Sequence, residues 1–400
     1  MKPLIDNTLV RDKELKHALG MSVPSAKDDE WKYTRFDEIL DGTFEVAESN
    51  AANPSSKSLR DVFQNKHDGY NIVFINGFYS EELSSCGNLV VTLQGASKPL
   101  NWLYTDIFAT MNDTSLQNEL CIDIPEDSTL LKPIKIHFIA DTDGRKLITQ
   151  PRLYIKAGNG CNATIVESYY NFHGTANKEN SSTSSAYFTN SYTHIVLGRN
   201  SKLQHYKIQN EYRGALHLSR TYVHHDKGSS FSSHMAMFGG KVARNEIDVD
   251  MNNTGAYTSL RGIYIAKPYQ HHNCLVKVNH VAPHCVSEIK YKGVIHEHGS
   301  AAFDGLISAK PGAIKTDAKM VNNNLLLSKS AEANTRPRLE ILVDDVKCSH
   351  GATIAQISSE ALFYLRTRGV LEEEARKILT EGFVEEIVKG APFLRDVFLV

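Results

Sequence analysis

The sequence lacks the features of several common functional classes. Its charge is nearly balanced, with 44 Lys and Arg residues against 46 Asp and Glu, so no net positive field is available to hold nucleic-acid phosphates. Apolar runs such as 71–78 and 354–365 are shorter than the roughly 18–20 residues that span a bilayer. The first ten residues contain no apolar signal segment. We therefore expect a cytoplasmic protein that binds neither nucleic acid nor a membrane.

Motifs for nucleotide binding, hydrolysis and local chelation are also missing. Gly239-Gly240-Lys241 is followed by Val242 and lacks the upstream glycine spacing of a phosphate-binding loop. There is no G-x-S-x-G elbow and no G-x-G-x-x-G opening a helix. The 6 cysteines lie far apart without a C-x-x-C pair, which argues against a zinc ribbon or a cluster held by four local thiolates. We do not expect this chain to be an enzyme or to hydrolyse ATP by itself.

The chain is long enough for two or three domains at about 100–200 residues each, and its composition changes twice. Residues 1–115 mix helical and strand patterns, whereas 116–345 contain short β runs separated by Gly and Asn turns. Several of these turns recur at intervals near 28 residues, which favours a stacked β-solenoid over a Greek-key sandwich. Residues 346–400 predict a helical pair, with Ser358 as an N-cap and Gly369 as a helix stop.

Histidine is the unusual part of the composition, because twelve of the 17 histidines lie between His194 and His298. Residues two apart on a strand share a face. His296 and His298 are therefore a candidate metal-binding pair, and Asp248 and Asp250 are a candidate pair of catalytic carboxylates. Polar positions near a turn explain the histidine pair better than a metal site does, and exposed alternation on a strand explains the aspartate pair at least as well as catalysis.

Cys348 and His350 form a further candidate pair, also two residues apart. Thiolate and imidazole groups both ligate iron, zinc and copper. Two ligands do not close a site, since iron and zinc normally take four or more. If metal binds at this pair, the other ligands must come from another chain. The alternative is a buried cysteine beside a turn-capping histidine.

Several continuous segments of the sequence, one of them around this pair, form a recognisable pattern. They are Arg336–Thr353, Ala361–Gly369, Tyr291–Val294, Phe303–Gly305, Lys315–Ala318, Asn324–Ser328 and, near the N-terminus, Glu30–Thr34. Together they closely resemble the signature of the SufB/SufD family of iron–sulfur cluster assembly proteins, over nearly the whole chain. The string Cys348–Thr353 is most like SufD-type members, and the chain departs from the family pattern at Ala355 and at Ile357-Ser358.

The resemblance implies a mainly β fold with three parts. These are a small N-terminal α/β domain (1–115), a right-handed parallel β-helix core (116–345) and a C-terminal helical domain (346–400). It also implies a non-catalytic scaffold subunit of a SufBCD complex in the SUF system, acting in iron acquisition and nascent cluster assembly. The partners would be a SufB-like paralogue and a SufC-like ABC ATPase that drives the complex.

The resemblance further assigns residues to these roles. His350 would be a metal ligand, and His350 with Cys348 would hold iron or the nascent iron–sulfur cluster together with the SufB-like paralogue. The ATPase would dock on the C-terminal helices, at positions that include Ala361, Tyr364, Leu365 and Arg368. We expect no cofactor on the isolated chain. A β-helix face meant for the paralogue also favours a homodimer when the chain is alone.

Two other functions stay open at this point. A secreted-type β-helix polysaccharide lyase or hydrolase would use Asp248 and Asp250, and it requires a secretion signal and a carbohydrate groove. A freestanding metal-binding protein would use the histidine-rich middle, and it predicts several tightly bound metal ions per chain.

Overall fold

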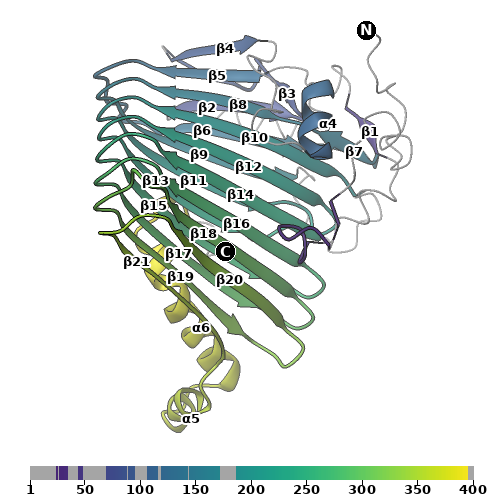
Figure 1. Ribbon diagram of the computed structural model, residues 1–400. Coiled ribbons are helices and arrows are strands. Elements are labelled where there is room, and N and C mark those ends of the chain that lie inside the picture. The colour runs from purple at the N-terminus through teal and green to yellow at the C-terminus, as the bar shows by residue number, and fades with distance from the viewer. Residues whose placement is uncertain are drawn as a thin grey trace.

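The protein is a β-solenoid built from two sheets of mainly parallel strands (Figure 1). The computed structural model describes residues 24–25, 27–34, 44–47, 69–87, 89–94, 106–115, 119–142, 144–171 and 186–394. The mainly β composition and the parallel β-helix core expected from the sequence are both confirmed. None of the helices in these ranges is long and apolar enough to cross a membrane.

The strands divide between two sheets, here called sheet A and sheet B. Sheet A contains β1 (Glu45–Val46), β4 (Val90–Gln94), β5 (Glu119–Ile124), β7 (Leu147–Thr149), β8 (Arg152–Ala157), β10 (Phe188–Leu197), β12 (Leu216–His225), β14 (Val242–Met251), β16 (His271–His280), β18 (Ser300–Ala309) and β20 (Glu332–Ile341). Sheet B contains β2 (Tyr70–Ile75), β3 (Phe78–Tyr79), β6 (Ile134–Ala140), β9 (Asn162–Asn171), β11 (Lys202–Asn210), β13 (Ser230–Met237), β15 (Tyr257–Ala266), β17 (Val286–Ile295), β19 (Asp317–Leu326) and β21 (Lys347–Gln356).

From β10 onward each coil contributes one strand to each sheet. Phe188 pairs with Leu216, and Val242 pairs with His271, so the coil repeats after 28 and 29 residues at these positions. The turn spacing that the sequence showed is therefore the length of one coil.

One corner of the coil explains why those turns are rich in Gly and Asn. Between the sheet A strand and the sheet B strand, one residue of each coil has a positive φ: Asp127, Gly160, Asn200, Gly228, Gly255, His284, Lys315 and Asp345. Gly, Asn and Asp adopt this left-handed conformation more readily than other residues. Its backbone N–H donates to the next coil, as from Asn200 to the Lys227 carbonyl at 2.9 Å.

The interior of the solenoid is mostly apolar but holds buried charged groups in its middle coils. Glu167 on β9 lies 3.0 Å from His205 Nε2 and 3.4 Å from Lys207 Nζ on β11, and all three side chains are buried. Burial alone would raise the pKa of Glu167, but the Lys207 ammonium and the His205 hydrogen bond lower it to about 2. Glu167 and Lys207 thus form a buried ion pair in the native state, with His205 hydrogen-bonded to Glu167.

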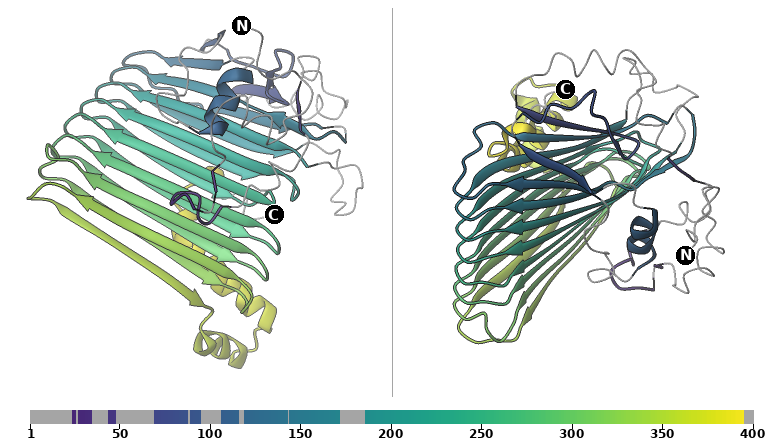
Figure 2. Two further views of the ribbon diagram at one scale, coloured as in Figure 1. Left: turned by 45° about the vertical axis from the view of Figure 1, so that its right-hand side comes forward. Right: turned by 90° about the horizontal axis from the view of Figure 1, so that it is seen from above.

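Different elements cover the outer faces of the two sheets. Trp31 and α4 (Ile107–Ser115) pack on the outside of sheet A, against a cluster that includes Phe188 and Leu218. The C-terminal helix α6 (Glu372–Val388) packs on the outside of sheet B. Seen from above, α4 and α6 lie on opposite sides of the solenoid (Figure 2).

The helical pair expected after residue 346 is present and follows the last strand. Ser358 accepts a hydrogen bond from the Ala361 N–H and caps α5 (Ser359–Thr367), while Gly369 has a φ of 88° and ends that helix region. The division into 1–115, 116–345 and 346–400 stays a prediction. Strands on both sides of each boundary belong to the same sheets, because β2 pairs with β6 and β21 pairs with β19.

Candidate functional site

The solenoid ends in an open face formed by β20 and β21. Within the described part of the chain, each of these strands pairs on one side only, β20 with β18 and β21 with β19. Ile354 on β21 is 46% exposed, whereas Asn324, its partner on β19, is 1% exposed. Side chains that would be interior in any earlier coil therefore meet solvent here, and both sheets present unpaired backbone groups.

Cys348 and His350 lie on β21 at this open face. Their partners on β19 are Ala318 and Met320, which are buried in the interior core. Because positions alternate along a strand, both candidate ligands share the interior-facing side of β21. Cys348 is half-buried and packs against the core, whereas His350 is exposed. The pair thus sits where the interior becomes accessible from outside.

The surroundings of Cys348 keep its thiol protonated. Burial raises the pKa of the Cys348 thiol above its usual value, and the Asp317 carboxylate raises it further. A thiol must lose its proton to ligate a metal. A positive charge brought to the open face, by a metal ion or by a second chain, would favour that loss.

The structure assembles no larger ligand set at this point. Among the residues that the structure describes, no group of three or more His, Cys, Asp and Glu side chains is placed to hold a metal ion. Any further ligands for Cys348 and His350 would come from outside this chain. Their assignment as ligands stays a prediction.

The second candidate pair, Asp248 and Asp250, does share the outer face of β14, but neighbouring strands hold both carboxylates. The Asn279 amide donates to Asp248 at 3.0 Å and to Asp250 at 2.8 Å, and the Tyr222 hydroxyl donates to Asp250 at 2.5 Å. Burial raises the pKa of Asp248 to about 6, with Lys277 opposing and Asp250 adding to the shift. These contacts form a hydrogen-bonded ladder between coils.

The rings of the third candidate pair, His296 and His298, do not share a face. Strand β17 ends at Ile295, and His298 has a φ of 53°, so the segment is a turn rather than an extended strand. The His298 ring stacks on Tyr269 with 5.5 Å between ring centroids. His296 instead lines a cavity beneath α6. The expectation that both rings share a face assumed extended backbone and is wrong here.

Of the residues predicted to dock an ATPase, Ala361, Tyr364 and Leu365 lie on α5, which projects beyond the last coil (Figure 1), and Arg368 is the C-cap of this helix. None of the nine residues of α5, all of them described, is buried. Tyr364 is 58% exposed and lies under the Arg368 guanidinium, 5.3 Å from it, while Ala361 and Leu365 are half-buried. Phe363 is 69% exposed, and the sequence analysis missed it because it lies off the apolar stripe of the helix.

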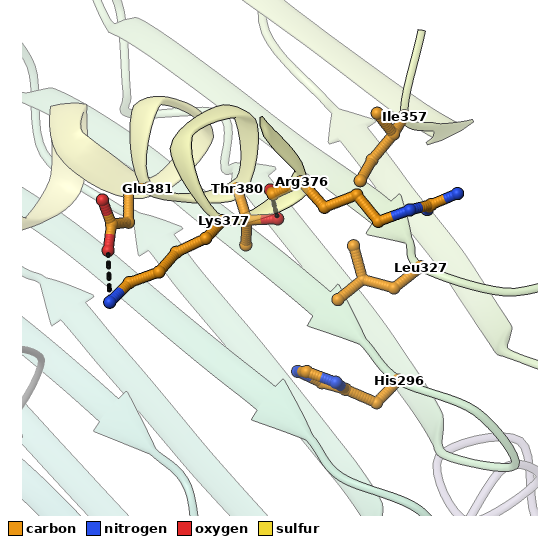
Figure 3. Close-up of a pocket in the computed structure, with 7 residues that line it drawn as sticks. All are labelled: His296, Leu327, Ile357, Arg376, Lys377, Thr380 and Glu381. Carbon is orange, nitrogen blue, oxygen red and sulfur yellow. Dashed lines mark hydrogen bonds and ion pairs between the residues drawn. The ribbon is translucent and has the colours of Figure 1, made fainter. Parts of the chain in front are cut away.

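A cavity of 320 Å³ separates the first turns of α6 from the ends of the sheet B strands (Figure 3). It is lined by His296, Leu327, Ile357, Arg376, Lys377, Thr380 and Glu381. These residues come from four separate stretches of sequence, so no local pattern could have indicated the cavity.

Comparison with known proteins gives consistent matches. A family model described as "SUF system FeS cluster assembly, SufBD core domain" matches residues 138–383, more than half of the chain. The chain is 28% identical to an iron–sulfur cluster assembly SufBD family protein of Synechocystis, over 93% of this chain and 85% of that protein. It is 29% identical to the iron–sulfur cluster assembly protein SufD of Escherichia coli, over 96% and 88% respectively.

Proposed function

The chain belongs to the SufBD family of iron–sulfur cluster assembly proteins, and from this premise we propose that it is a non-catalytic subunit of a cytoplasmic SufBCD-type scaffold. Iron and the nascent cluster are the cargo of this scaffold and are bound only in the assembled complex. The isolated chain carries no resident cofactor in this proposal. The observation that carries it is the open face, where Cys348 and His350 lie on an edge strand.

The first partner in the proposal is a SufB-like paralogue that covers the open face. Long unpaired edge strands are sites at which another chain adds to a sheet. β20 and β21 are each 10 residues long and carry exposed apolar side chains, including Ile341 and Ile354. In the absence of the paralogue, the same face favours a homodimer.

The second partner is a SufC-like ABC ATPase that docks on α5. The exposed Phe363 and Tyr364 rings, with Arg368 over the Tyr364 ring, give this helix apolar docking groups and a positive charge. Aromatic residues and arginine are enriched among the residues that dominate binding energy at interfaces. The chain itself has no phosphate-binding loop, so nucleotide binding belongs to the partner.

At the site, His350 supplies a neutral imidazole nitrogen to iron. Cys348 supplies a thiolate once its proton has left, and the paralogue supplies the remaining ligands. The burial of Cys348 raises its pKa, so the thiol stays protonated until positive charge arrives. The open face therefore becomes able to bind the cluster when the partner chain covers it.

The test is anaerobic co-expression with candidate SufB-like and SufC-like partners, followed by affinity capture and absorption spectroscopy. We expect His350→Ala to form the ternary complex but to yield at least tenfold less cluster than wild type. Ser349→Ala, on the opposite side of the same strand, is the matched control and keeps the wild-type yield. Normal cluster yield from His350→Ala would rule out the ligand role, and failure to capture a ternary complex would rule out the scaffold.

A further inference from the structure

Residues 28–34, here called the strap, lie on the outer face of sheet A (dark purple in the left view of Figure 2). The strap folds into a turn in which the Trp31 N–H donates to the Asp28 carbonyl at 2.8 Å, and a second turn joins Thr34 to Trp31 at 2.9 Å. Trp31 and Thr34 are buried, and the Trp31 ring lies 4.2 Å from the Arg244 guanidinium. The strap includes the segment 30–34 of the family resemblance, to which the proposed function gives no role.

Two inner strands of sheet A hold the middle and the end of the strap. On β14, the Arg244 guanidinium donates to the Glu30 carbonyl and to the Thr34 hydroxyl, each at 2.8 Å. On β16, the Asn273 amide donates to the same hydroxyl at 2.7 Å. Lys277, also on β16, forms an ion pair with the Glu30 carboxylate at 2.5 Å. The strap is therefore fixed to strands that have neighbours on both sides.

The start of the strap reaches the edge strand β20. The Arg336 guanidinium on β20 donates to the Asp29 carbonyl at 2.8 Å, and its Nε donates to the Asp304 carboxylate at 3.0 Å. Asp304 lies on β18, so Arg336 is joined both to the neighbouring strand and to the strap. Strands β14, β16, β18 and β20 are consecutive in sheet A, and three strand spacings amount to about 14 Å. The strap thus connects the edge strand to strands two and three coils earlier.

An edge strand depends on such a connection more than an inner strand does. Within the described residues β20 pairs on one side only, with β18. A strand held by one ladder of backbone hydrogen bonds opens locally at a lower cost in free energy than a strand held by two. A partner strand adds to an edge only where that edge is extended and in register. A restraint on β20 from outside its own ladder therefore bears directly on assembly.

We infer that the strap holds β20 extended and in register for the strand that a second chain adds to sheet A, and that Arg336 is the positioning residue that transmits this restraint. The inference rests on the proposed function, because the paralogue supplies the added strand. Arg338, two residues further along β20, provides the contrast. Its hydrogen bonds go to Asp304, at 3.2 and 2.8 Å, so it joins β20 to β18 but not to the strap.

The first test is amide hydrogen exchange of the isolated chain, followed in peptides from β20 and from β14. We expect Arg336→Lys to accelerate exchange in β20 at least fivefold and to leave β14 within twofold of wild type. The physical reason is that a lysine ammonium lacks the planar fork with which the guanidinium spans Asp304 and the Asp29 carbonyl. Arg338→Lys is the matched control on the same strand and against the same carboxylate, and it should change exchange in β20 less than twofold.

A second variant loosens the strap at its other end. Thr34→Val keeps the shape of the side chain and removes the hydroxyl that accepts from Arg244 and Asn273, neither of which lies on β20. We expect it to accelerate exchange in β20 at least threefold, because the strap then restrains Arg336 less. Unchanged exchange in Thr34→Val, or equal acceleration by Arg336→Lys and Arg338→Lys, would mean that the strap does not hold the edge strand.

The second test is binding of the SufB-like paralogue to the full chain. We expect the dissociation constant to rise at least fivefold for Arg336→Lys and at least threefold for Thr34→Val, and to stay within twofold of wild type for Arg338→Lys. Wild-type binding by the first two variants would overturn the inference while the scaffold proposal stands. If the wild-type chain binds no paralogue, the proposed function fails, and the exchange rates still decide whether the strap restrains β20.

Discussion

The two ends of the solenoid are built differently. At the first end sheet B finishes in the two-residue strand β3, antiparallel to β2, and sheet A finishes in β4, antiparallel to β5. At the other end both sheets finish in ten-residue parallel strands, β20 and β21. Five of the six residues of β2 are buried, whereas no residue of β21 is.

The difference shows which end of the solenoid is protected against pairing with other strands and which end leaves its candidate ligands accessible. Each coil buries its interior side against its neighbours, so a terminal coil without a cap exposes core positions. Short antiparallel strands block further pairing at the first end. The open end lacks such a cap among the described residues, and it carries the candidate ligands. We therefore expect stability to depend on the first end and assembly on the second.

The largest effect that would sharpen this contrast is a core truncation at the capped end. Phe74 on β2 is 1% exposed, and its ring lies 5.2 Å from that of Phe138 and 5.9 Å from that of Tyr79. Phe74→Ala should destabilise the isolated chain by about 3–5 kcal/mol, through lost burial and a residual cavity. Denaturant unfolding measures it, with Ile354→Ala at the open end as the comparison.

Ile354→Ala should change the stability of the isolated chain by less than about 0.5 kcal/mol, because Ile354 is already about half exposed at the end of the solenoid. The same variant should weaken capture of the paralogue. Equal destabilisation by Phe74→Ala and Ile354→Ala would show that the two ends do not differ in this way.

A second prediction concerns acid, which should weaken contacts between coils. His280 lies 2.8 Å from Ser287 in the same coil and 3.5 Å from Thr316 in the next coil, and burial lowers its pKa to about 4. The unfolded chain binds a proton near pH 6.5 and the native chain does not, so this contribution is complete above pH 6.5 and is lost as the pH falls toward 4.

For His280 alone the loss is about 1.4 kcal/mol per pH unit below 6.5. His225 belongs to the same class, because burial lowers its pKa to about 3. Unfolding measured from pH 7.5 to 4.5 tests the slope, and His280→Gln should flatten it. A slope that is the same in wild type and His280→Gln would contradict the assignment.

A smaller effect is expected at helix α5. The Ser358 hydroxyl accepts from the Ala361 N–H at 3.1 Å and caps α5. Ser358→Ala should cost about 1 kcal/mol of local helix stability, and it should do so without moving the global unfolding midpoint. Amide hydrogen exchange of α5 measures the local change, with Ser359→Ala as control. A shift of the global midpoint would mean that α5 is part of the cooperative core.

The smallest effect on stability should come from Tyr364→Ala, since the ring is 58% exposed. Thermal unfolding of the isolated chain should stay within about 0.5 kcal/mol of wild type. Capture of the ATPase should nevertheless fall at least tenfold, and Lys377→Ala on the neighbouring α6 should leave it unchanged. Undiminished capture by Tyr364→Ala would remove α5 as the docking surface.

Local sequence patterns predicted the features that depend on local backbone. The Gly and Asn turns reported the coil length because a left-handed residue is needed at the same corner of every coil. The spacing of Cys348 and His350 predicted that they share a face, because both lie within one strand. The expectation that His296 and His298 share a face failed because β17 ends at Ile295 and His298 adopts a positive φ in the turn that follows.

Features built from distant segments were beyond local patterns. The ion pair between Lys290 on β17 and Glu386 on α6 joins residues almost one hundred positions apart, and both look like ordinary surface residues in the sequence. The strands β2 and β4 belong to the same sheets as the later coils through pairings with β6 and β5. Such contacts depend on how the coils stack, which no window of the sequence contains.

The position of α6 at the end of the chain has a consequence for synthesis. Val166 and Tyr206 on the outer face of sheet B are covered by residues as late as Leu394. At roughly 5–20 residues per second, the ribosome takes on the order of ten to fifty seconds to deliver that cover after Val166. During this interval the nascent chain displays an apolar stripe, and a truncated product displays it permanently. The last turns of α6 and the residues after it therefore decide whether this face of sheet B is apolar or covered.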